Sequence, residues 1–244
     1  MHVQQAHAWT QALRAGGWFA SLPAGLAAGL VAQATVRPLA AGQRLFARGE
    51  AGDGIYCVLR GAVRITGITR DGSEALLALL EPPQWFGEIA LFDNAPRTHD
   101  AWAESDALLL HVALPALQAM LDAHPGYWKD FGRLLAQKMR AVFAVVEDSA
   151  VLPATARVAS RLAAMAGGFG AWNGRSKRFV RVSQGQLGLM LSLSRQTVNG
   201  SLKELEAAGA IHRGRGAVEI LDVDRLLALG APGDHGAPRG GEPL

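Results

Sequence analysis

Residues 86–101 read FGEIALFDNAPRTHDA, and this stretch is the most informative part of the chain. Within sixteen positions it combines a glycine, a carboxylate, a short apolar turn and an arginine followed by a hydroxyl residue. The glycine lets the backbone approach another group closely, because it has no side chain. A helix that starts there can bind an anion through its first backbone N–H groups. The residues expected at this helix start are Gly87, Glu88, Ile89 and Ala90.

The same segment can hold a phosphodiester and a ribose together. The guanidinium of Arg97 can donate a pair of parallel hydrogen bonds to phosphate oxygens. Thr98 can donate a further bond to the phosphate, and the carboxylate of Glu88 can accept one from a ribose 2′-hydroxyl. An alternative that these residues leave open is a structural loop with a surface salt bridge between Glu88 and Arg97.

The sequence around this segment predicts a barrel of short strands. Between residues 34 and 112, glycines separate short apolar runs, which is typical of a β-sandwich or a jelly-roll barrel. Residues 70–72, Arg-Asp-Gly, are expected to form a hairpin turn, because Asp-Gly tolerates positive φ. Residues 8–33 precede the barrel and are expected to be helical, with breaks at Gly16-Gly17 and Pro23. The runs are VRPL, RLFAR, IYCVLR, AVRITGI, EALLALL, AWAE and ALLLHV.

A long helix is expected after the barrel, from Pro125 to about Ala150. Its apolar residues recur with the spacing of a heptad seam, and a seam of this length needs a partner surface. We expect two copies of the chain to pair in parallel through it, and the alternative is that the seam packs on its own barrel. The seam residues are Leu135, Met139, Val142 and Val146.

Residues 183–209, SQGQLGLMLSLSRQTVNGSLKELEAAG, predict two helices joined by a tight turn. Ser183 and Gln186 form a capping box for the first helix, Ser194 caps the second, and Gly209 ends it. The start of the second helix would read base edges, and the run AIHRGRGAVEIL would form a two-stranded wing that meets phosphates. The alternative is a helical protein-interaction domain. The expected DNA contacts are Ser194, Arg195, Gln196, Thr197 and Asn199 on the helix, and Arg213 and Arg215 on the wing.

The 244 residues carry a net charge of +3 that is unevenly distributed. Residues 1–150 hold 12 basic and 14 acidic side chains, whereas residues 151–228 hold 11 basic and 5 acidic. The part with the helix-turn-helix pattern is therefore the basic one, which favours double-stranded DNA as its partner. A further basic cluster is expected at Arg175, Lys177, Arg178 and Arg181.

The composition indicates a cytoplasmic protein that is not an enzyme. No apolar run reaches the roughly 18 residues of a membrane span, and the N-terminus lacks the layout of a signal peptide. Cys57 is the single cysteine, so it can hold no iron–sulfur cluster and is expected to be a small buried hydrophobe. A barrel metalloenzyme would need a cluster such as His-x-His, which does not occur, and no motif supports His99 or His111 as a haem ligand. We expect no metal and no cofactor.

The segment at residues 86–101 resembles the phosphate-binding cassette of cyclic-nucleotide-binding domains. With the barrel, long helix and helix-turn-helix in this order, the chain resembles the cyclic-AMP receptor / fumarate-nitrate regulator (CRP/FNR) superfamily over about residues 20–225. The cassette matches are Gly87, Glu88, Leu91, Arg97, Thr98 and Ala101. The resemblance implies an α+β fold with a jelly-roll (double-stranded β-helix) domain at residues 18–125, a dimerisation helix and hinge at 126–152, a winged helix-turn-helix at 153–228 and a disordered tail at 229–244.

The resemblance also implies the function and the partners. The chain would be a cyclic-nucleotide-responsive transcription regulator that acts as a homodimer on pseudo-palindromic operators. Its partners would be a small-molecule cyclic nucleotide as regulatory ligand, double-stranded DNA, a second copy of the chain and RNA polymerase, but no membrane. The alternative within the superfamily is a ligand-independent member with a vestigial pocket.

The chain departs from the superfamily pattern at two places. Val142 and Phe143 stand where the cyclic-AMP receptor protein offers adjacent hydroxyl residues to adenine, and neither side chain can form a hydrogen bond. Thr98 could instead bond a guanine edge. A guanine-containing ligand, cyclic GMP or cyclic di-GMP, is therefore expected to bind at least as well as cyclic AMP. In the recognition helix, Gln196 replaces a common glutamate and Gly200 a common arginine, which changes the expected half-site.

Overall fold

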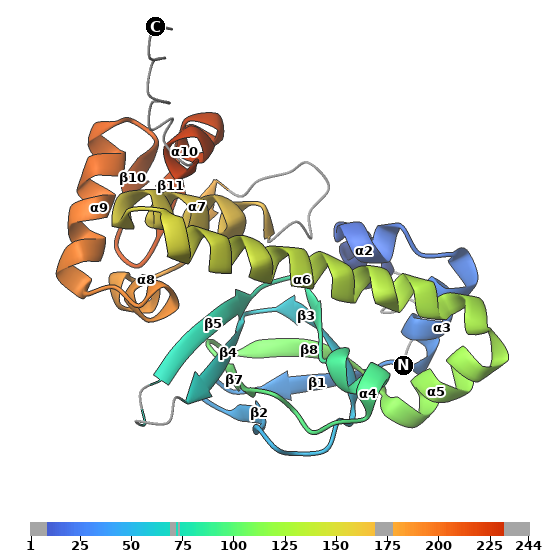
Figure 1. The fold of residues 1–244 in the computed structure, drawn as a ribbon. Helices are drawn as coiled ribbons and strands as arrows, with labels where there is room; N and C mark the ends of the chain where they lie inside the picture. Colours follow the sequence, from blue (N-terminus) through green and yellow to red (C-terminus); the bar gives the residue numbers. More distant parts are fainter. Residues whose placement is uncertain (1–8, 69–71, 73, 169–177, 232–244) are drawn as a thin grey trace, which may run out of the picture. The chain divides into compact units, whose positions relative to one another are not determined.

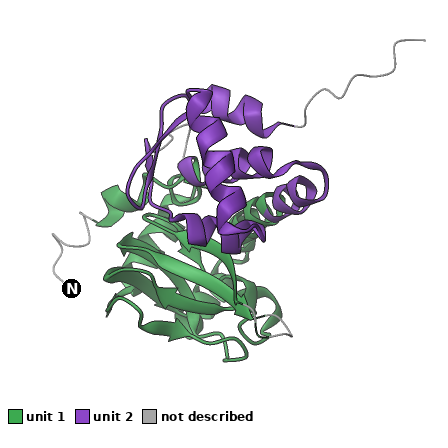
Figure 2. Cartoon of the chain, turned by 90° about the vertical axis from the view of Figure 1, so that its left-hand side faces the viewer, with its two compact units in different colours: residues 1–141, 167–175 green, residues 142–166, 176–244 purple. Residues whose placement is uncertain are grey.

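The computed structural model describes residues 9–68, 72, 74–168 and 178–231. The chain forms two compact units, residues 1–141 with 167–175 and residues 142–166 with 176–244 (Figure 2). The boundary between the two units lies between residues 141 and 142, inside the long helix. The domain ranges expected from the sequence instead give this helix and the hinge their own segment, residues 126–152, and these ranges stay predictions. Most of the expected turn at 70–72, the expected basic residues Arg175 and Lys177, and the tail from 232 onward lie outside the described residues.

Two antiparallel sheets form the barrel of the first unit (Figure 1). Among the described residues their strand orders are β1-β8-β3-β6 and β2-β7-β4-β5. This confirms the expected jelly-roll barrel, and each apolar run quoted above supplies one of its longer strands. The two-residue strand β6 was not expected, because so short a segment carries no periodicity. The strands are β1 (Thr35–Leu39), β2 (Arg44–Phe46), β3 (Gly54–Arg60), β4 (Val63–Ile68), β5 (Glu74–Leu80), β6 (Trp85–Phe86), β7 (Asp100–Ala103) and β8 (Ala107–Ala113).

Rows of buried side chains fill the inside of the barrel. Val63 pairs with Leu80 on one side and with Ala103 on the other, and all three are buried in one hydrophobic cluster. Gly61 makes the turn before β4 with φ +75°, and a Cβ there would lie 2.2 Å from the backbone oxygen of Asp106. Only glycine fits this turn, because the backbone both has positive φ and touches its neighbour.

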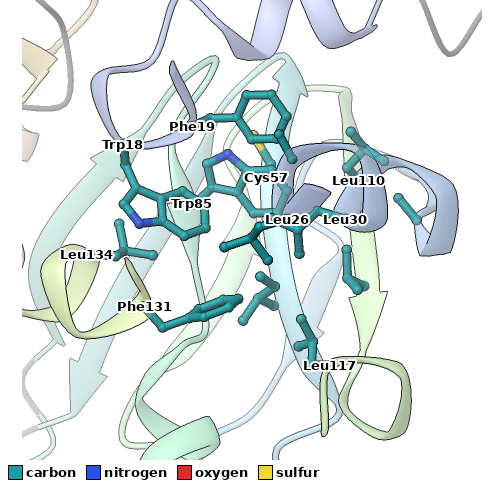
Figure 3. Close-up of a cluster of buried hydrophobic side chains, with 14 of the residues drawn as sticks. Trp18, Phe19, Leu26, Leu30, Cys57, Trp85, Leu110, Leu117, Phe131 and Leu134 are labelled. Atoms are coloured by element: carbon teal, nitrogen blue, oxygen red, sulfur yellow. The ribbon is translucent and has the colours of Figure 1, made fainter. Parts of the chain in front are cut away.

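The outer face of the sheet that contains β3 and β8 packs against helices α2 (Gly17–Ala20), α3 (Ala24–Gln33) and α5 (Leu114–Ala123) (Figure 3). Phe19 stacks on Trp85 with ring centroids 5.8 Å apart, and Trp18 meets the same ring edge-on at 5.4 Å. Aromatic pairs in these geometries add to the stability that burial alone supplies. Cys57 lies in this core, as expected, and burial raises the pKa of its thiol well above the ordinary value.

A short 3-10 turn, η1 (Pro125–Tyr127), leads into the long helix α6 (Trp128–Val151). The expected long helix is thus confirmed, with Pro125 opening the segment as predicted. Near its start, Phe131 and Leu134 are buried in the core of the first unit. Further along, most of the large apolar side chains of α6 are exposed.

The second unit is the expected helix-turn-helix with a wing (Figure 1). Val198, Leu202 and Leu205 form the buried face of its second helix. The wing differs from expectation in one respect: among the described residues its sheet has the order β10-β11-β9, so a third, two-residue strand joins the expected pair. The elements are α7 (Ala154–Ala166), β9 (Phe179–Val180), α8 (Gln184–Leu191), α9 (Arg195–Ala207), β10 (Ile211–Arg213), β11 (Val218–Ile220) and α10 (Val223–Gly230).

Candidate nucleotide site and DNA-binding face

The expected phosphate-binding segment forms a short helix, α4 (Ile89–Asp93), directly after strand β6. Gly87 lies between them with φ +93°, and a Cβ on it would lie 2.9 Å from the Nη1 atom of Arg97. The glycine is therefore required by its backbone conformation and by the close approach of the arginine. Asn94 ends α4 in the left-handed region, with φ 54°, and turns the chain toward Arg97.

Arg97 is almost completely buried, with 6 % of its surface exposed. One terminal nitrogen donates to the backbone oxygen of Gly87 at 2.9 Å, and the other donates to that of Gly54 at 2.9 Å. The second nitrogen also forms an ion pair of 2.6 Å with Asp53. The guanidinium stacks over the ring of Phe46, 4.3 Å from its centroid.

The Nε atom of Arg97 is buried and has no hydrogen-bond partner among the described residues. A buried donor without an acceptor typically costs about 1–3 kcal/mol, so such donors are uncommon in folded proteins. An anionic oxygen supplied by a ligand would satisfy this one.

Glu88 is also buried, with 1 % of its surface exposed, and its partner is not the one considered above. The Nζ atom of Lys138 on α6 lies 2.6 Å from a carboxylate oxygen of Glu88. Arg97 pairs with Asp53 instead, so the alternative of a surface salt bridge between Glu88 and Arg97 is wrong. The two residues lie in the same part of the barrel, but each has its own counter-charge.

Sequence reasoning missed two residues of this arrangement, Asp53 and Lys138. Asp53 directly precedes strand β3 and could be taken for a turn residue; Lys138 is one of several charged residues on an amphipathic helix. Partial burial by itself raises the pKa of Asp53, but hydrogen bonds from Tyr56 and Arg97 outweigh it and hold that pKa below its ordinary 3.8. Burial and the hydrogen bond to Asp53 raise the pKa of Tyr56.

Of the remaining residues expected at the ligand, Ala90 is buried, whereas those that are exposed are Ile89, Thr98, Val142 and Phe143. The hydroxyl of Thr98 lies 2.9 Å from Nδ1 of His99, and burial together with the charge of Arg48 lowers the pKa of His99. Val142 and Phe143, the residues expected to face the base, are 56 % and 64 % exposed. They lie on the part of α6 that belongs to the second unit.

The expected seam residues on α6 leave a row of apolar side chains at the surface. Met139, Val142 and Val146 are 48 %, 56 % and 58 % exposed, and Leu135 is half-buried. Large apolar side chains gathered on one helix face are the usual mark of an interaction surface.

The helix-turn-helix places most of its expected DNA contacts on the surface. Ser183 and Gln186 form the predicted capping box of α8, and the hydroxyl of Ser194 caps α9 by accepting from the backbone of Thr197 at 3.0 Å. Arg195 and Gln196 follow on the exposed first turn of α9. Further expected contacts that are exposed are Ser194, Thr197 and Arg215.

Two of the expected DNA contacts are held by other side chains. Asn199 is half-buried, and its side-chain oxygen accepts from Gln184 and from Arg213, both at 3.4 Å. Arg213 is fixed by Glu206, which accepts from its Nε at 2.6 Å and from its backbone N–H at 2.8 Å. These bonds from Arg213 lower the pKa of Glu206.

A cavity of about 400 Å³ opens between the start of α8, the start of α9 and the wing. Basic side chains and backbone N–H groups at a helix start together favour phosphate oxygens. The lining residues include Ser183, Gln184, Arg195, Arg213 and Gly216.

Within the residues that the structure describes, no helix is long and apolar enough to cross a bilayer. Nor does any group of three or more His, Cys, Asp or Glu side chains in that part of the chain have the arrangement of a metal site.

Solved structures share this architecture. FixK2 from Bradyrhizobium japonicum aligns with a TM-score of 0.69 at 22 % identity, covering 81 % of this chain and 98 % of that one. The c-di-GMP responsive global regulator CLP of Xanthomonas campestris aligns with a TM-score of 0.63 at 22 % identity, covering 81 % of this chain and 99 % of that one. At this identity the likeness concerns the fold alone.

Sequence relatives and family models identify the family. A CRP-like cAMP-activated global transcriptional regulator of Mycobacterium tuberculosis is 31 % identical over 186 residues, which cover 76 % of this chain and 83 % of the relative. A cyclic AMP receptor protein of Thermus thermophilus is 29 % identical, with the same coverage. The family model for the cyclic nucleotide-binding domain matches residues 36–124, and that for the Crp-like helix-turn-helix domain matches residues 156–229. The chain therefore belongs to the CRP family of DNA-binding transcription regulators, with a cyclic nucleotide-binding domain ahead of a Crp-like helix-turn-helix domain.

Proposed function

We propose that this protein is a homodimeric transcription regulator whose barrel binds a cyclic nucleotide and whose second unit then binds a pseudo-palindromic operator. The observation that carries the proposal is the state of Arg97: it is buried, held by two backbone oxygens and by Asp53, and its Nε has no acceptor among the described residues. A cyclic phosphate supplies an oxygen for that donor.

The neighbouring carboxylate would hold the sugar. Glu88 is buried beside the phosphate-binding segment, and one of its oxygens pairs with Lys138. A carboxylate has several lone pairs, so its second oxygen can accept a ribose 2′-hydroxyl while the ion pair persists. Because Lys138 belongs to α6, this contact would link ligand binding to the long helix. Such a link shifts an equilibrium between two conformations of the protein only if the ligand binds one conformation more tightly than the other.

We propose that the site binds a guanine nucleotide at least as tightly as the adenine nucleotide cyclic AMP. Val142 and Phe143 lack hydrogen-bonding groups, so they cannot select adenine by the polar contacts that hydroxyl residues would make. The Mycobacterium tuberculosis relative is named as cAMP-activated. The affinities of this protein for cyclic AMP and for guanine nucleotides therefore need to be compared directly.

The exposed seam on α6 is proposed as the dimer interface, and the second unit as the DNA reader. Two readers related by a two-fold axis would contact half-sites about 10–10.5 base pairs apart. Arg195 and Gln196 on the first turn of α9 would read base edges, while Arg215 would contact phosphate. RNA polymerase is the proposed further partner where the protein activates transcription.

Calorimetric titration with cyclic AMP, cyclic GMP and cyclic di-GMP tests the ligand proposal. Arg97→Ala should weaken binding of every nucleotide that binds the parent, by about 1.5–3 kcal/mol or more. Arg60→Ala is the matched control, because Arg60 is an exposed arginine at the far end of strand β3. If the parent protein binds no nucleotide, the chain is instead a ligand-independent member with a vestigial pocket. Clear selectivity for cyclic AMP over both guanine nucleotides would overturn the proposal about the base.

A further inference from the structure

Helix α4 carries large apolar side chains on its outer side. Ala90 and Leu91 are buried, whereas the residues on either side of them are not. Ile89 and Phe92 are 43 % and 40 % exposed, and because they lie three positions apart they share one face of the helix. The ring of Phe92 contacts that of Trp128 at the start of α6, with centroids 5.4 Å apart, and Trp128 is itself 36 % exposed. Ile89, Phe92 and Trp128 thus form one exposed apolar surface, the α4 patch, of the kind that marks an interaction site.

Two contacts fix α4 alongside the first half of α6. Glu88, directly before α4, forms its ion pair with Lys138. Four positions later in the chain, Phe92 contacts Trp128, which precedes Lys138 on α6. The residue number rises along α4 while it falls along α6, so the two segments run antiparallel. The α4 patch therefore lies beside the first turns of α6.

The heptad seam of α6 continues to the α4 patch. Trp128 stands one heptad before Leu135, and Gly132 stands one heptad before Met139, so both fall on the positions of the seam. A Cβ built on Gly132 would meet no atom within 4 Å among the described residues, which leaves room for another helix to approach. The seam and the α4 patch thus form one continuous apolar surface.

Within the described part of the chain, the barrel leaves this surface open. Helix α6 contacts the barrel through a different stripe, on which Phe131 and Leu134 are buried and Lys138 forms its ion pair. A stable dimer buries about 800 Å² on each partner. The four seam side chains alone fall short of this area, because each is already about half-covered. A second copy that pairs in parallel through the seam also brings the start of its own α6 to the level of Trp128.

We propose that the α4 patch is buried against the second copy of the chain, so that the dimer interface extends from the seam to the helix of the phosphate-binding segment. This rests on the proposed homodimer, which requires the seam alone. Association would remove the apolar side chains of the patch from water, and this burial favours the dimer. Gly87 and Glu88 directly precede α4, so the nucleotide site and the dimer interface would meet in one short helix.

Thiol labelling tests whether the second copy covers the patch. Cys57 is the single cysteine and is fully buried, so a cysteine introduced at the surface is the reactive one. Ile89→Cys is labelled with N-ethylmaleimide in the otherwise unchanged full chain and in the full chain that also carries Met139→Glu and Val146→Glu, which is expected to be monomeric. We expect labelling to be about tenfold slower in the dimer, at a concentration that leaves about a tenth of the chains monomeric.

The control for this labelling is Val36→Cys. Val36 on strand β1 is 37 % exposed and lies outside the patch, so its labelling rate should be the same in both backgrounds. Equal rates for Ile89→Cys in the dimer and in the monomer would overturn the α4 patch as an interface and leave the homodimer intact. A parent that is monomeric by light scattering, or a double variant that stays dimeric, would contradict the proposed seam itself, and the inference would fail with it.

Replacing the aromatic ring measures its contribution to the dimer. Phe92→Gln should raise the dissociation constant of the dimer about tenfold, since each dimer loses two buried apolar side chains. Phe92→Leu keeps an apolar side chain and should raise the constant less than about threefold, and Val36→Gln should leave it unchanged. Sedimentation equilibrium measures all three variants. A dissociation constant of Phe92→Gln equal to that of the parent, or equal losses in both Phe92 variants, would refute the extended interface.

Discussion

The Nζ atom of Lys138 lies 2.6 Å from a carboxylate oxygen of Glu88, so the long helix α6 is tied to the phosphate-binding segment by an ion pair. The two ends differ: the side chain of Glu88 is 2 % exposed and that of Lys138 is 36 % exposed. The carboxylate of Glu88 is therefore largely removed from water. The cost of burying its negative charge is offset by the ammonium group of Lys138, which water still reaches.

Removing that counter-charge should destabilise the first unit. Lys138→Met leaves a buried carboxylate without its partner, and we expect a loss of about 1–3 kcal/mol in the free energy of unfolding, because water can partly replace the exposed ammonium. Adding Glu88→Gln should recover part of this loss. Urea denaturation measures both. Lys129→Met, at an exposed lysine of the same helix, is the control, and an equal loss in that variant would contradict the coupling.

Acid should weaken the fold through Asp53. Its pKa is lowered in the folded state, so its contribution to stability is fully present above its ordinary 3.8 and is lost as the pH falls through the lower folded value. The difference in unfolding free energy between the parent and Asp53→Asn should be largest above pH 3.8 and shrink below it. Denaturation of both proteins over a pH series checks this; a difference that stays constant across that window would mean that the carboxylate is not stabilised by Tyr56 and Arg97.

Charges placed on the exposed seam of α6 should separate the dimer. Met139→Glu with Val146→Glu puts two carboxylates on a face that would be apolar and buried in the dimer, so light scattering should report monomers. The matched control is Gln137→Glu with Ala144→Glu, which adds carboxylates at exposed positions on the opposite side of the helix. If the seam variant remains a dimer, the interface lies elsewhere.

The first turn of α9 should determine sequence specificity. Arg195→Ala should relax the preference for guanine at one symmetric position of each half-site, a discrimination of roughly 1–3 kcal/mol. Arg215→Ala should instead weaken all sequences alike and make the salt dependence shallower, because a phosphate contact carries no sequence information. Selection of bound sequences from a random pool compares the parent with both variants. A motif of unchanged sharpness for Arg195→Ala would remove this residue from the reading surface.

Asn199 should act differently from its neighbours on α9. Its side-chain oxygen already accepts bonds from Gln184 and Arg213, so it orients the wing arginine as it stands. We expect Asn199→Ala to weaken binding to specific and nonspecific DNA by similar factors, as filter binding or anisotropy would show. A change of preferred bases in that variant would instead make Asn199 a direct reader.

Much of this fold could be predicted from local sequence. Apolar runs between glycines specify short strands, the spacing of Leu135 and Met139 marks a long amphipathic helix, and Ser183 with Gln186 marks a helix start. These signals work because each depends on residues close together in the chain. The phosphate-binding segment is local in the same sense, since Gly87 and Arg97 are ten positions apart. The two-residue strands β6 and β9 were missed, because pairing with distant strands defines them.

The partners of the buried charges were decided only by the tertiary structure. Arg97 and Glu88 lie close in sequence and have opposite charge, yet the fold pairs Arg97 with Asp53 and Glu88 with Lys138. Likewise, Arg37 and His111 converge on Asp53 only because β1, β8 and β3 are neighbours in one sheet. The chain itself determined which chemical groups are present and which local elements carry them. Their pairing depended on strand order and on the docking of α6, since electrostatic partners are set by distance in space and by burial, neither of which is encoded by spacing along the chain.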